Sequence, residues 1–384
     1  MRKPTHRVVI TGTGAISALG DSTDALWEGL LASCCGIRRL SRFVEIGLPV
    51  TTGGEVVSIP YYQIDRDEVI ASRAIEAAFS EAELSSQNVG FLWATGLDTF
   101  QVSENGFTYR SAGKCFTALA KRFTGHKRMI ATACASGTQA IGEAFNLIRD
   151  GQIECCIAGG SSTMLTPFYL IGFAGLQAIA IDNENENSVA VCCPFDRKRR
   201  GFTLADGAGA VVLETLDSAR RRGVKILGEV IGFGVSQDAF DLNRPAENGV
   251  GAILCMERSL INAGISPKDI DAVNAHGTAT YLGDLAEAAA IRYLFGEKIP
   301  VSGIKGAVGH AMAAAGALEA IVALKTCVTG IVPPTVNLVQ PDENCELNHV
   351  IGEPLFTDAK TVLSVSFGMG GQNAGIILRR MNNG

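Results

Sequence analysis

Short apolar runs bounded by glycine or polar residues alternate with helical patterns along this chain. Such runs predict strands of a buried sheet, and they occupy residues 8–10, 89–93, 129–130 and 155–160. Apolar positions with helical spacing predict helices at 23–32, 70–82 and 140–148. Gly12 and Gly14 follow the first run, and a glycine pair ends the last, which predicts tight turns there. This alternation is typical of an α/β fold, and the polar run 182–187 predicts a solvated loop.

Two parts of the chain resemble two others, which favours an internal duplication. A strand followed by Gly-x-Gly at 10–14 is echoed at 230–234, and Cys134 before a helix of small residues is echoed by His310 before the helix 311–324. We therefore expect two βα halves, residues 1–218 and 219–384, that meet near 217–225. Cys134 and His310 would then occupy related positions and face each other across a pseudo-dyad.

Composition excludes several classes of protein. With 384 residues and 47% hydrophobic content the chain can bury a large core, and a net charge of −6 gives no reason to expect nucleic acid or a membrane as partner. Eleven cysteines without C-x-x-C spacing fit neither a disulfide framework nor a metal site. The apolar helix 311–324 is too short for a membrane span and carries Glu319. No signal peptide pattern is present, so we expect a cytoplasmic protein.

Three side chains are candidates for chemistry. Cys134 lies where the strand 129–130, expected to be buried, meets the helix, and there the helix dipole would lower the pKa of the thiol and favour a nucleophilic thiolate. The alternative is a buried structural cysteine. His276 and His310 lie in glycine-bounded turns after apolar runs, where they could be structural hydrogen bonders or, together with a thiol, catalytic groups.

Four motifs in a fixed order then identify a family resemblance. They are T-A-C-A-S-G, N-A-H-G-T-x-T-x-x-G-D, K-G-x-x-G-H-x-x-x-A-A-G-A and S-F-G-x-G-G-x-N. The set resembles the elongating β-ketoacyl-acyl-carrier-protein synthases with a Cys-His-His triad, over residues 7–37 and nearly all of 129–379. The resemblance implies the thiolase fold, a duplicated α/β architecture in five αβαβα layers, and the decarboxylative condensation of an acyl chain with malonyl-acyl carrier protein in fatty-acid or type II polyketide synthesis.

The resemblance also implies roles for individual residues. Cys134 would hold the acyl chain, the two histidines would stabilise an enolate, and the N–H groups of Cys134 and Met369 would form the oxyanion hole. Lys305 matches the motif lysine, and Glu319 needs a buried partner, for which Lys305 is the candidate. Asp284 and Glu287 would be supporting or capping residues. The substrate-binding residues implied are Thr278, Thr280, Phe202, Phe367 and Met369; for the two threonines, turn capping is an open alternative.

The implied substrates are carried on the phosphopantetheine arm of acyl carrier protein, without a separate cofactor or metal. Basic residues near the entrance would attract this acidic partner, and two runs are candidates: Lys121, Arg122, Lys127 and Arg128, or residues 197–200. A homodimer and a heterodimer with a related ketosynthase or chain-length factor are both open.

The sequence departs from the family at two points. Met369 stands where a phenylalanine gate is usual, and the region before Cys134 is short, so chain length cannot be predicted. A non-catalytic chain-length-factor-like subunit is the main alternative, although that role has no use for a triad. A degradative thiolase would need a second catalytic cysteine near the C-terminus, and a starter-unit synthase would have Asn in place of His310.

Overall fold

A computed structural model describes residues 5–84, 88–103, 106–181 and 191–381. Its main element is an 11-stranded mixed sheet. In spatial order the strands are β14 (Asn348–His349), β12 (Pro300–Ser302), β11 (Ala272–Asn274), β16 (Thr361–Phe367), β17 (Gln372–Arg379), β10 (Gly228–Gln237), β1 (Val8–Ile16), β9 (Asp206–Thr215), β8 (Cys155–Thr163), β4 (Gly90–Thr95) and β7 (Lys127–Ile130). Two-stranded sheets pair β2 (Arg38–Arg39) with β3 (Thr52–Gly53), β5 (Thr99–Ser103) with β6 (Gly106–Arg110), and β13 (Ile331–Val332) with β15 (Leu355–Phe356).

The large sheet divides between its two central strands. β1 and β10 pair only through Val8–Ile10 and residues 228–230. Directly after this contact the register shifts in both strands. Beyond the shift β1 pairs only with β9, and β10 pairs only with β17. Because bulges bend and twist a strand, the two parts of the sheet diverge and leave room for helices between them.

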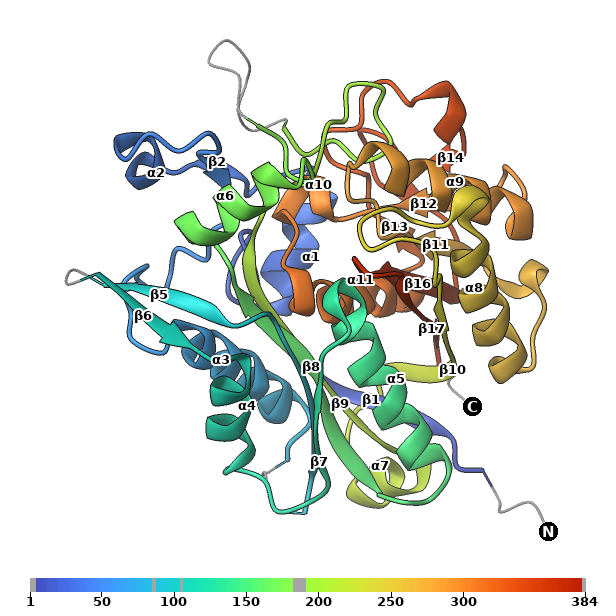
Figure 1. The fold of residues 1–384 in the computed structure, drawn as a ribbon. Helices are drawn as coiled ribbons and strands as arrows, with labels where there is room; N and C mark the ends of the chain where they lie inside the picture. Colours follow the sequence, from blue (N-terminus) through green and yellow to red (C-terminus); the bar gives the residue numbers. More distant parts are fainter. Residues whose placement is uncertain (1–4, 85–87, 104–105, 182–190, 382–384) are drawn as a thin grey trace.

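The helices form three layers around the two parts of the sheet (Figure 1). α5 (Ser136–Arg149) and α11 (Ala315–Thr329) contact both parts and form the middle layer. α3 (Arg66–Glu81) covers the outer face at β1 and β9, with α4 (Ala112–Ala120) beside it, while α8 (Val250–Ala263) covers β10 and β17, with α9 (Tyr281–Phe295) beside it. This αβαβα order is the expected thiolase fold. The remaining helices are α1 (Thr23–Leu31), α2 (Ser41–Glu45), α6 (Pro167–Gly175), α7 (Leu216–Arg222) and α10 (Lys305–Val308).

The glycines expected to form turns lie inside strands instead. Gly12 and Gly14 belong to β1, and a Cβ on either would come within 2.1 Å of the Ala78 carbonyl oxygen or 2.0 Å of the Ala74 carbonyl oxygen of α3. The glycine pair of β8 is likewise internal, since a Cβ on Gly159 would lie 2.0 Å from the Gly209 oxygen. The turn predictions are therefore wrong, because these glycines serve close packing of the backbone.

The second Gly-x-Gly has the same environment as the first. Gly232 and Gly234 lie in β10, where a Cβ on either would meet a carbonyl oxygen of α8 at 2.5 Å. The echo between 10–14 and 230–234 thus corresponds to two strands on which a helix packs closely. α7 crosses the expected boundary at residue 218, and the division into two units stays a prediction.

Most of the remaining elements agree with the sequence predictions. The helices expected at 23–32, 70–82 and 140–148 correspond to α1, α3 and α5, and the strand at 89–93 to β4. The strand at 129–130 exists as β7, at the edge of the sheet. Its predicted burial is confirmed for Ile130, which is 5% exposed, and wrong for Met129, which is 42% exposed. The run 182–187 lies outside the described residues. Within the described part of the chain, Met312–Thr329 is long and apolar enough to cross a membrane, but 83% of it is buried in the protein core.

Candidate active site

Cys134 lies at the turn between β7 and α5, as the sequence predicts. It belongs to a short 3-10 helix, Ala133–Ala135, that leads into α5, and Ala133 has a left-handed φ of 49°. Gly137 allows the start of α5 to pass close to the second such turn, since a Cβ there would lie 2.8 Å from the Ala313 carbonyl oxygen. The thiol is 3% exposed. Close approach of two turns therefore encloses the sulfur.

His310 faces this sulfur from the opposite turn. Its Nε2 lies 3.1 Å from Cys134 Sγ, and its Nδ1 accepts the backbone N–H of Met312 at 3.2 Å. Because Nδ1 is an acceptor, the proton of the neutral ring is on Nε2. His310 can therefore donate to the sulfur or to an oxygen bound next to it.

The two turns are related but their functional residues are not equivalent. Met312 begins the 3-10 helix Met312–Ala314 with φ 46°, as Ala133 begins the first with φ 49°. Cys134 comes directly after Ala133, the left-handed residue of its turn. His310 comes two positions before Met312, the left-handed residue of the other turn. The expected relation therefore holds for the turns, with an offset of three residues between the two side chains.

His276 completes the group from the end of β11. Lys305 Nζ lies 3.1 Å from His276 Nδ1 and also donates to the His276 carbonyl oxygen. A lysine ammonium has only donors, so the proton of this imidazole is also on Nε2. The two rings lie edge to face with their centroids 5.5 Å apart. Two N–H donors of neutral histidines thus lie near one thiol.

Lys305 and Glu319 form the buried ion pair that the sequence suggests. Lys305 Nζ donates to Glu319 Oε1, and the two side chains are 1% and 0% exposed. Ser366 donates to the other carboxylate oxygen at 3.3 Å. Burial raises the pKa of Glu319, and the ammonium opposes this shift. The pair keeps the lysine in contact with His276.

Burial decides the charge state of the thiol and the imidazoles. It raises the pKa of Cys134 to about 11, although Lys305 and the backbone N–H of Met369 lower it. The expectation of a low thiol pKa is therefore wrong, because complete desolvation outweighs the helix terminus. Burial and the Lys305 charge hold the pKa of both His276 and His310 well below the ordinary value. At neutral pH the site contains a thiol and two neutral imidazoles.

The glycine-rich loop after β16 lies against the nucleophile turn. A Cβ on Gly368 would be 2.9 Å from the Thr132 oxygen and 3.3 Å from the Cys134 nitrogen. Gly370 and Gly371 have φ of 95° and 81°, which only glycine adopts readily. The backbone N–H groups of Cys134 and Met369 both lower the pKa of the thiol. Two backbone donors therefore converge where a carbonyl on the sulfur would be bound.

A cavity of about 420 Å³ opens next to these groups. The expected site residues that line it are Cys134, Phe202, His276, Thr278, Thr280, His310, Phe367 and Met369. The hydroxyls of Thr278 and Thr280 lie 2.9 Å apart, and the Thr280 side chain does not cap α9. Turn capping therefore stays an alternative for both threonines, although Thr280 does not cap the helix itself. Phe202 stands edge to face against His310, and Phe367 against His276.

The family models and known relatives agree with this geometry. Residues 71–219 match the β-ketoacyl synthase N-terminal domain and 227–339 its C-terminal domain. The 3-oxoacyl-(acyl-carrier-protein) synthase 2 of Coxiella burnetii is 34% identical over 98% of this chain and 99% of its own length. That of Synechocystis sp. is 32% identical, covering 97% and 98%. The chain belongs to the β-ketoacyl synthase family. It is thus an acyltransferase of the 3-oxoacyl-carrier-protein synthase type.

Solved structures extend the likeness of this β-ketoacyl synthase to polyketide enzymes. One is a type II PKS acyl-carrier protein in complex with its ketosynthase bound to the hexaketide (AntDE:AntF), with a TM-score of 0.90 and 27% identity over 98% of this chain and 100% of that one. Another is the ishigamide ketosynthase/chain length factor, with a TM-score of 0.88, 28% identity and the same coverage.

Sequence reasoning missed the apolar wall beside the nucleophile of this β-ketoacyl synthase. Cys134 belongs to a buried apolar cluster with Phe202, Met312 and several residues of the segment that holds α6, namely Met164, Leu165, Tyr169, Leu170 and Phe173. Met369 packs against the same cluster. These apolar side chains resemble any core segment in the sequence, so no local signal distinguishes them. An acyl chain on Cys134 would meet this wall.

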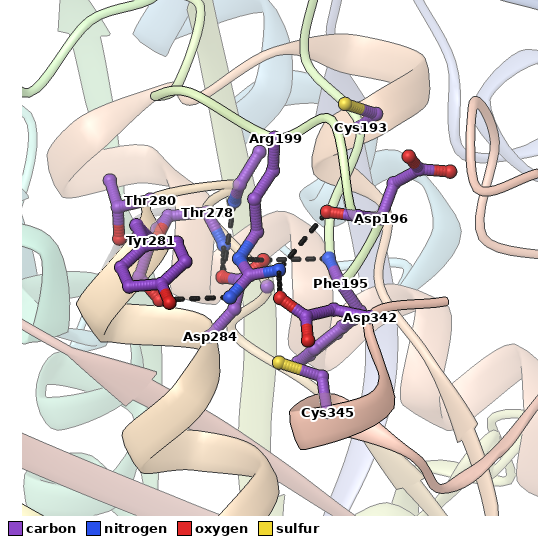
Figure 2. Close-up of polar contacts among 12 residues, drawn as sticks. Cys193, Phe195, Asp196, Arg199, Thr278, Thr280, Tyr281, Asp284, Asp342 and Cys345 are labelled. Carbon is purple, nitrogen blue, oxygen red and sulfur yellow. Dashed lines mark hydrogen bonds and ion pairs between the residues drawn. The ribbon is translucent and has the colours of Figure 1, made fainter. Parts of the chain in front are cut away.

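Neither basic run forms the expected patch at the cavity entrance in a simple way, because one run is partly buried and the other does not line the cavity. Arg199, in the run 197–200, is completely buried among carboxylates and carbonyls (Figure 2), so that run is not a continuous surface patch. In the other run, Arg122 pairs with Glu76 and Arg128 with Glu143. No residue of that run lines the cavity. A docking patch in either place stays a prediction.

Proposed function

We propose that this chain elongates acyl chains by decarboxylative condensation with malonyl-acyl carrier protein, in fatty-acid or type II polyketide synthesis. The observation that carries this proposal is the convergence of Cys134 Sγ, His310 Nε2 at 3.1 Å and the neutral His276 ring on one cavity. Substrates arrive on the phosphopantetheine arm of the carrier, so the chemistry needs no further cofactor.

In the first step the acyl group moves from carrier to cysteine. Cys134 Sγ bonds to the thioester carbonyl carbon, the bond to the pantetheine sulfur breaks, and the thiol proton leaves with that sulfur. The N–H groups of Cys134 and Met369 would stabilise the oxyanion. Because the pKa of the thiol is about 11, the proton has to leave as the sulfur attacks. The acyl chain would extend along the apolar wall of the α6 segment.

In the second step a malonyl thioester loses carbon dioxide and becomes a carbon nucleophile. The electron pair of the broken C–C bond forms an enolate whose oxygen would accept the Nε2 protons of His276 and His310. The enolate carbon attacks the acyl carbonyl, the bond to Cys134 Sγ breaks, and the sulfur takes up one proton. The products are a β-ketoacyl carrier, carbon dioxide and free thiol. Lys305 and Met312 support this step by bonding the two Nδ1 atoms.

The proposal includes a homodimer or a heterodimer with a related ketosynthase, and a place in the cytoplasm. The exposed edge strand β7 and the ketosynthase complexes among the structural neighbours support such assembly. A non-catalytic chain-length-factor-like role is the alternative, and the assembled donors around Cys134 argue against it.

The test is a condensation assay with purified chain, an acyl carrier thioester and malonyl carrier. We expect β-ketoacyl carrier and one carbon dioxide per product, both absent in Cys134→Ala. If the wild-type chain forms neither product alone or with a copurified partner, the catalytic proposal fails and the partner role gains.

A further inference from the structure

A fully buried arginine next to the cavity touches none of the reacting groups. Arg199 Nη1 donates to the Asp196 carbonyl oxygen at 3.0 Å and to Asp342 Oδ2 at 2.7 Å, while Nη2 donates to the Tyr281 carbonyl oxygen at 3.1 Å. Its guanidinium lies 4.9 Å from the Tyr281 ring. Figure 2 shows it between the start of α9 and the turn at Asp342. Arg199 therefore joins three segments that are distant in sequence.

The same guanidinium pairs with a carboxylate that binds the loop after His276. Arg199 Nε lies 3.8 Å from Asp284 Oδ2, and both side chains are 0% exposed. Asp284 Oδ1 accepts the N–H groups of Thr278 and Ala279, both at 3.1 Å, and Oδ2 accepts that of Phe195 at 2.6 Å. A buried carboxylate with these partners is most effective as an acceptor when it is ionised, and Arg199 is the cation beside it.

A second carboxylate of α9 extends this attachment to the catalytic histidine. Glu287 lies one helical turn after Asp284 and accepts the N–H groups of His276 at 2.7 Å and Gly277 at 2.8 Å. Together the two carboxylates bind four consecutive backbone N–H groups, those of residues 276–279. The loop is therefore held along its whole length by one face of α9.

The loop needs this support because its backbone is strained. Ala279 has a φ of 62°, a conformation that residues with a Cβ rarely adopt, and Gly277 has a φ of 41°. This conformation places the Thr278 and Thr280 hydroxyls 2.9 Å apart on the cavity wall. Tyr281, whose carbonyl Arg199 holds, lines the same wall. Strain of this kind persists only when surrounding contacts determine the geometry.

We propose that Arg199 is a positioning residue for pantetheine recognition, which holds Asp284 and the Tyr281 carbonyl so that the Thr278 and Thr280 hydroxyls can bind the amides of the arm. This inference rests on the proposed function, since it takes pantetheine thioesters as the substrates. Loss of Arg199 then weakens binding of the arm and leaves the Cys134 thiol and its oxyanion donors in place.

The test compares two acyl donors that share one short acyl group. One is the acyl-pantetheine thioester, and the other is the thiophenyl ester, which has no amide. For Arg199→Met we expect kcat/KM for acylation of Cys134 to fall about tenfold or more with the pantetheine donor, mostly through KM, and to stay within about twofold with the thiophenyl ester. Arg199→Lys keeps the charge but has one nitrogen in place of three, so it should show a smaller loss of the same kind.

Arg222→Met is the matched control. Arg222, at the end of α7, also pairs with a buried carboxylate, that of Glu214 at 2.8 Å, and it lines no part of the cavity. This variant should be less stable than the wild type, but its kcat/KM should change by the same factor with both donors. Equal losses with both donors in the Arg199 variants, or the same selective loss in Arg222→Met, would overturn the inference. If Arg199→Met does not fold, Arg199→Lys decides the question by the same comparison of the kcat/KM losses with the two donors. Failure of the wild-type chain to be acylated by either donor would instead reject the proposed function, and the inference with it.

Discussion

His310 Nε2 lies 3.1 Å from Cys134 Sγ, and the backbone N–H of Met312 fixes the ring so that this nitrogen carries the proton. In this tautomer His310 is a hydrogen-bond donor to the sulfur and cannot take the thiol proton. The pair therefore differs from a cysteine–histidine couple in which the imidazole acts as base. Nucleophile activation here depends on the substrate that enters.

The first prediction concerns the pH at which Cys134 reacts without substrate. Because burial raises its pKa to about 11, the thiolate fraction should rise about tenfold per pH unit between pH 7 and 10. Alkylation of the Cys134 peptide by iodoacetamide, followed by mass spectrometry, should show this slope. The exposed Cys34 provides an internal reference in the same digest. A rate for Cys134 that is already constant above pH 8 would contradict the account.

The second prediction concerns the buried pair Lys305 and Glu319. Lys305→Met leaves an unpaired carboxylate in the core and should lower the free energy of unfolding by about 3 to 5 kcal/mol. The double variant Lys305→Met, Glu319→Leu removes both charges and should recover much of that loss. Urea unfolding of the two variants measures the difference. If the double variant is no more stable than the single one, the unpaired Glu319 carboxylate is not what lowers the free energy of unfolding.

The third prediction concerns the close approach of α3 to β1. Gly14→Ala places a Cβ 2.0 Å from the Ala74 carbonyl oxygen, so the strand or the helix has to move, at a cost of about 3 kcal/mol or more. Gly172→Ala in α6 is the control, since nothing lies within 4 Å of its Cβ position, and it should leave stability equal or slightly raised. Thermal unfolding of the two variants tests this. If Gly14→Ala and Gly172→Ala change the stability equally, the close approach of α3 to β1 does not restrict the residue at position 14.

The fourth prediction concerns Met369, which packs against the apolar cluster around Cys134. Phenylalanine is bulkier and stiffer than methionine, so Met369→Phe should shift the product-length distribution and reduce kcat/KM for the longest acyl donor accepted about tenfold more than for acetyl. Met369→Leu, of similar volume, should stay close to wild type. Unchanged product lengths in Met369→Phe would remove Met369 from the determinants of chain length.

The sequence was sufficient to predict which side chains meet around Cys134, because their signals are local. Cys134, His276 and His310 each lie in a short motif, and the buried ion pair followed from a lone carboxylate in an apolar helix. The role of Gly12 and Gly14 is not local in this sense, since a glycine needed for a turn and one needed for close packing look alike in sequence.

The errors at the site have a common cause in burial, which a local pattern does not contain. The pKa of Cys134 depends on complete desolvation, and Arg199 looked like a surface residue because its neighbours in the run 197–200 are charged. Its carboxylate partners, Asp284 and Asp342, come from segments more than 80 residues away. Only the folded chain brings these groups together.

The central claim is that Cys134 carries the acyl chain and releases it to a malonyl-derived carbon. The most direct measurement is intact-protein and peptide mass spectrometry after incubation with an acyl carrier thioester, followed by addition of malonyl carrier. We predict one acyl adduct on the Cys134 peptide, absent in Cys134→Ala, that disappears as β-ketoacyl carrier forms. An adduct on another cysteine, or no adduct with any chain length, would contradict the account.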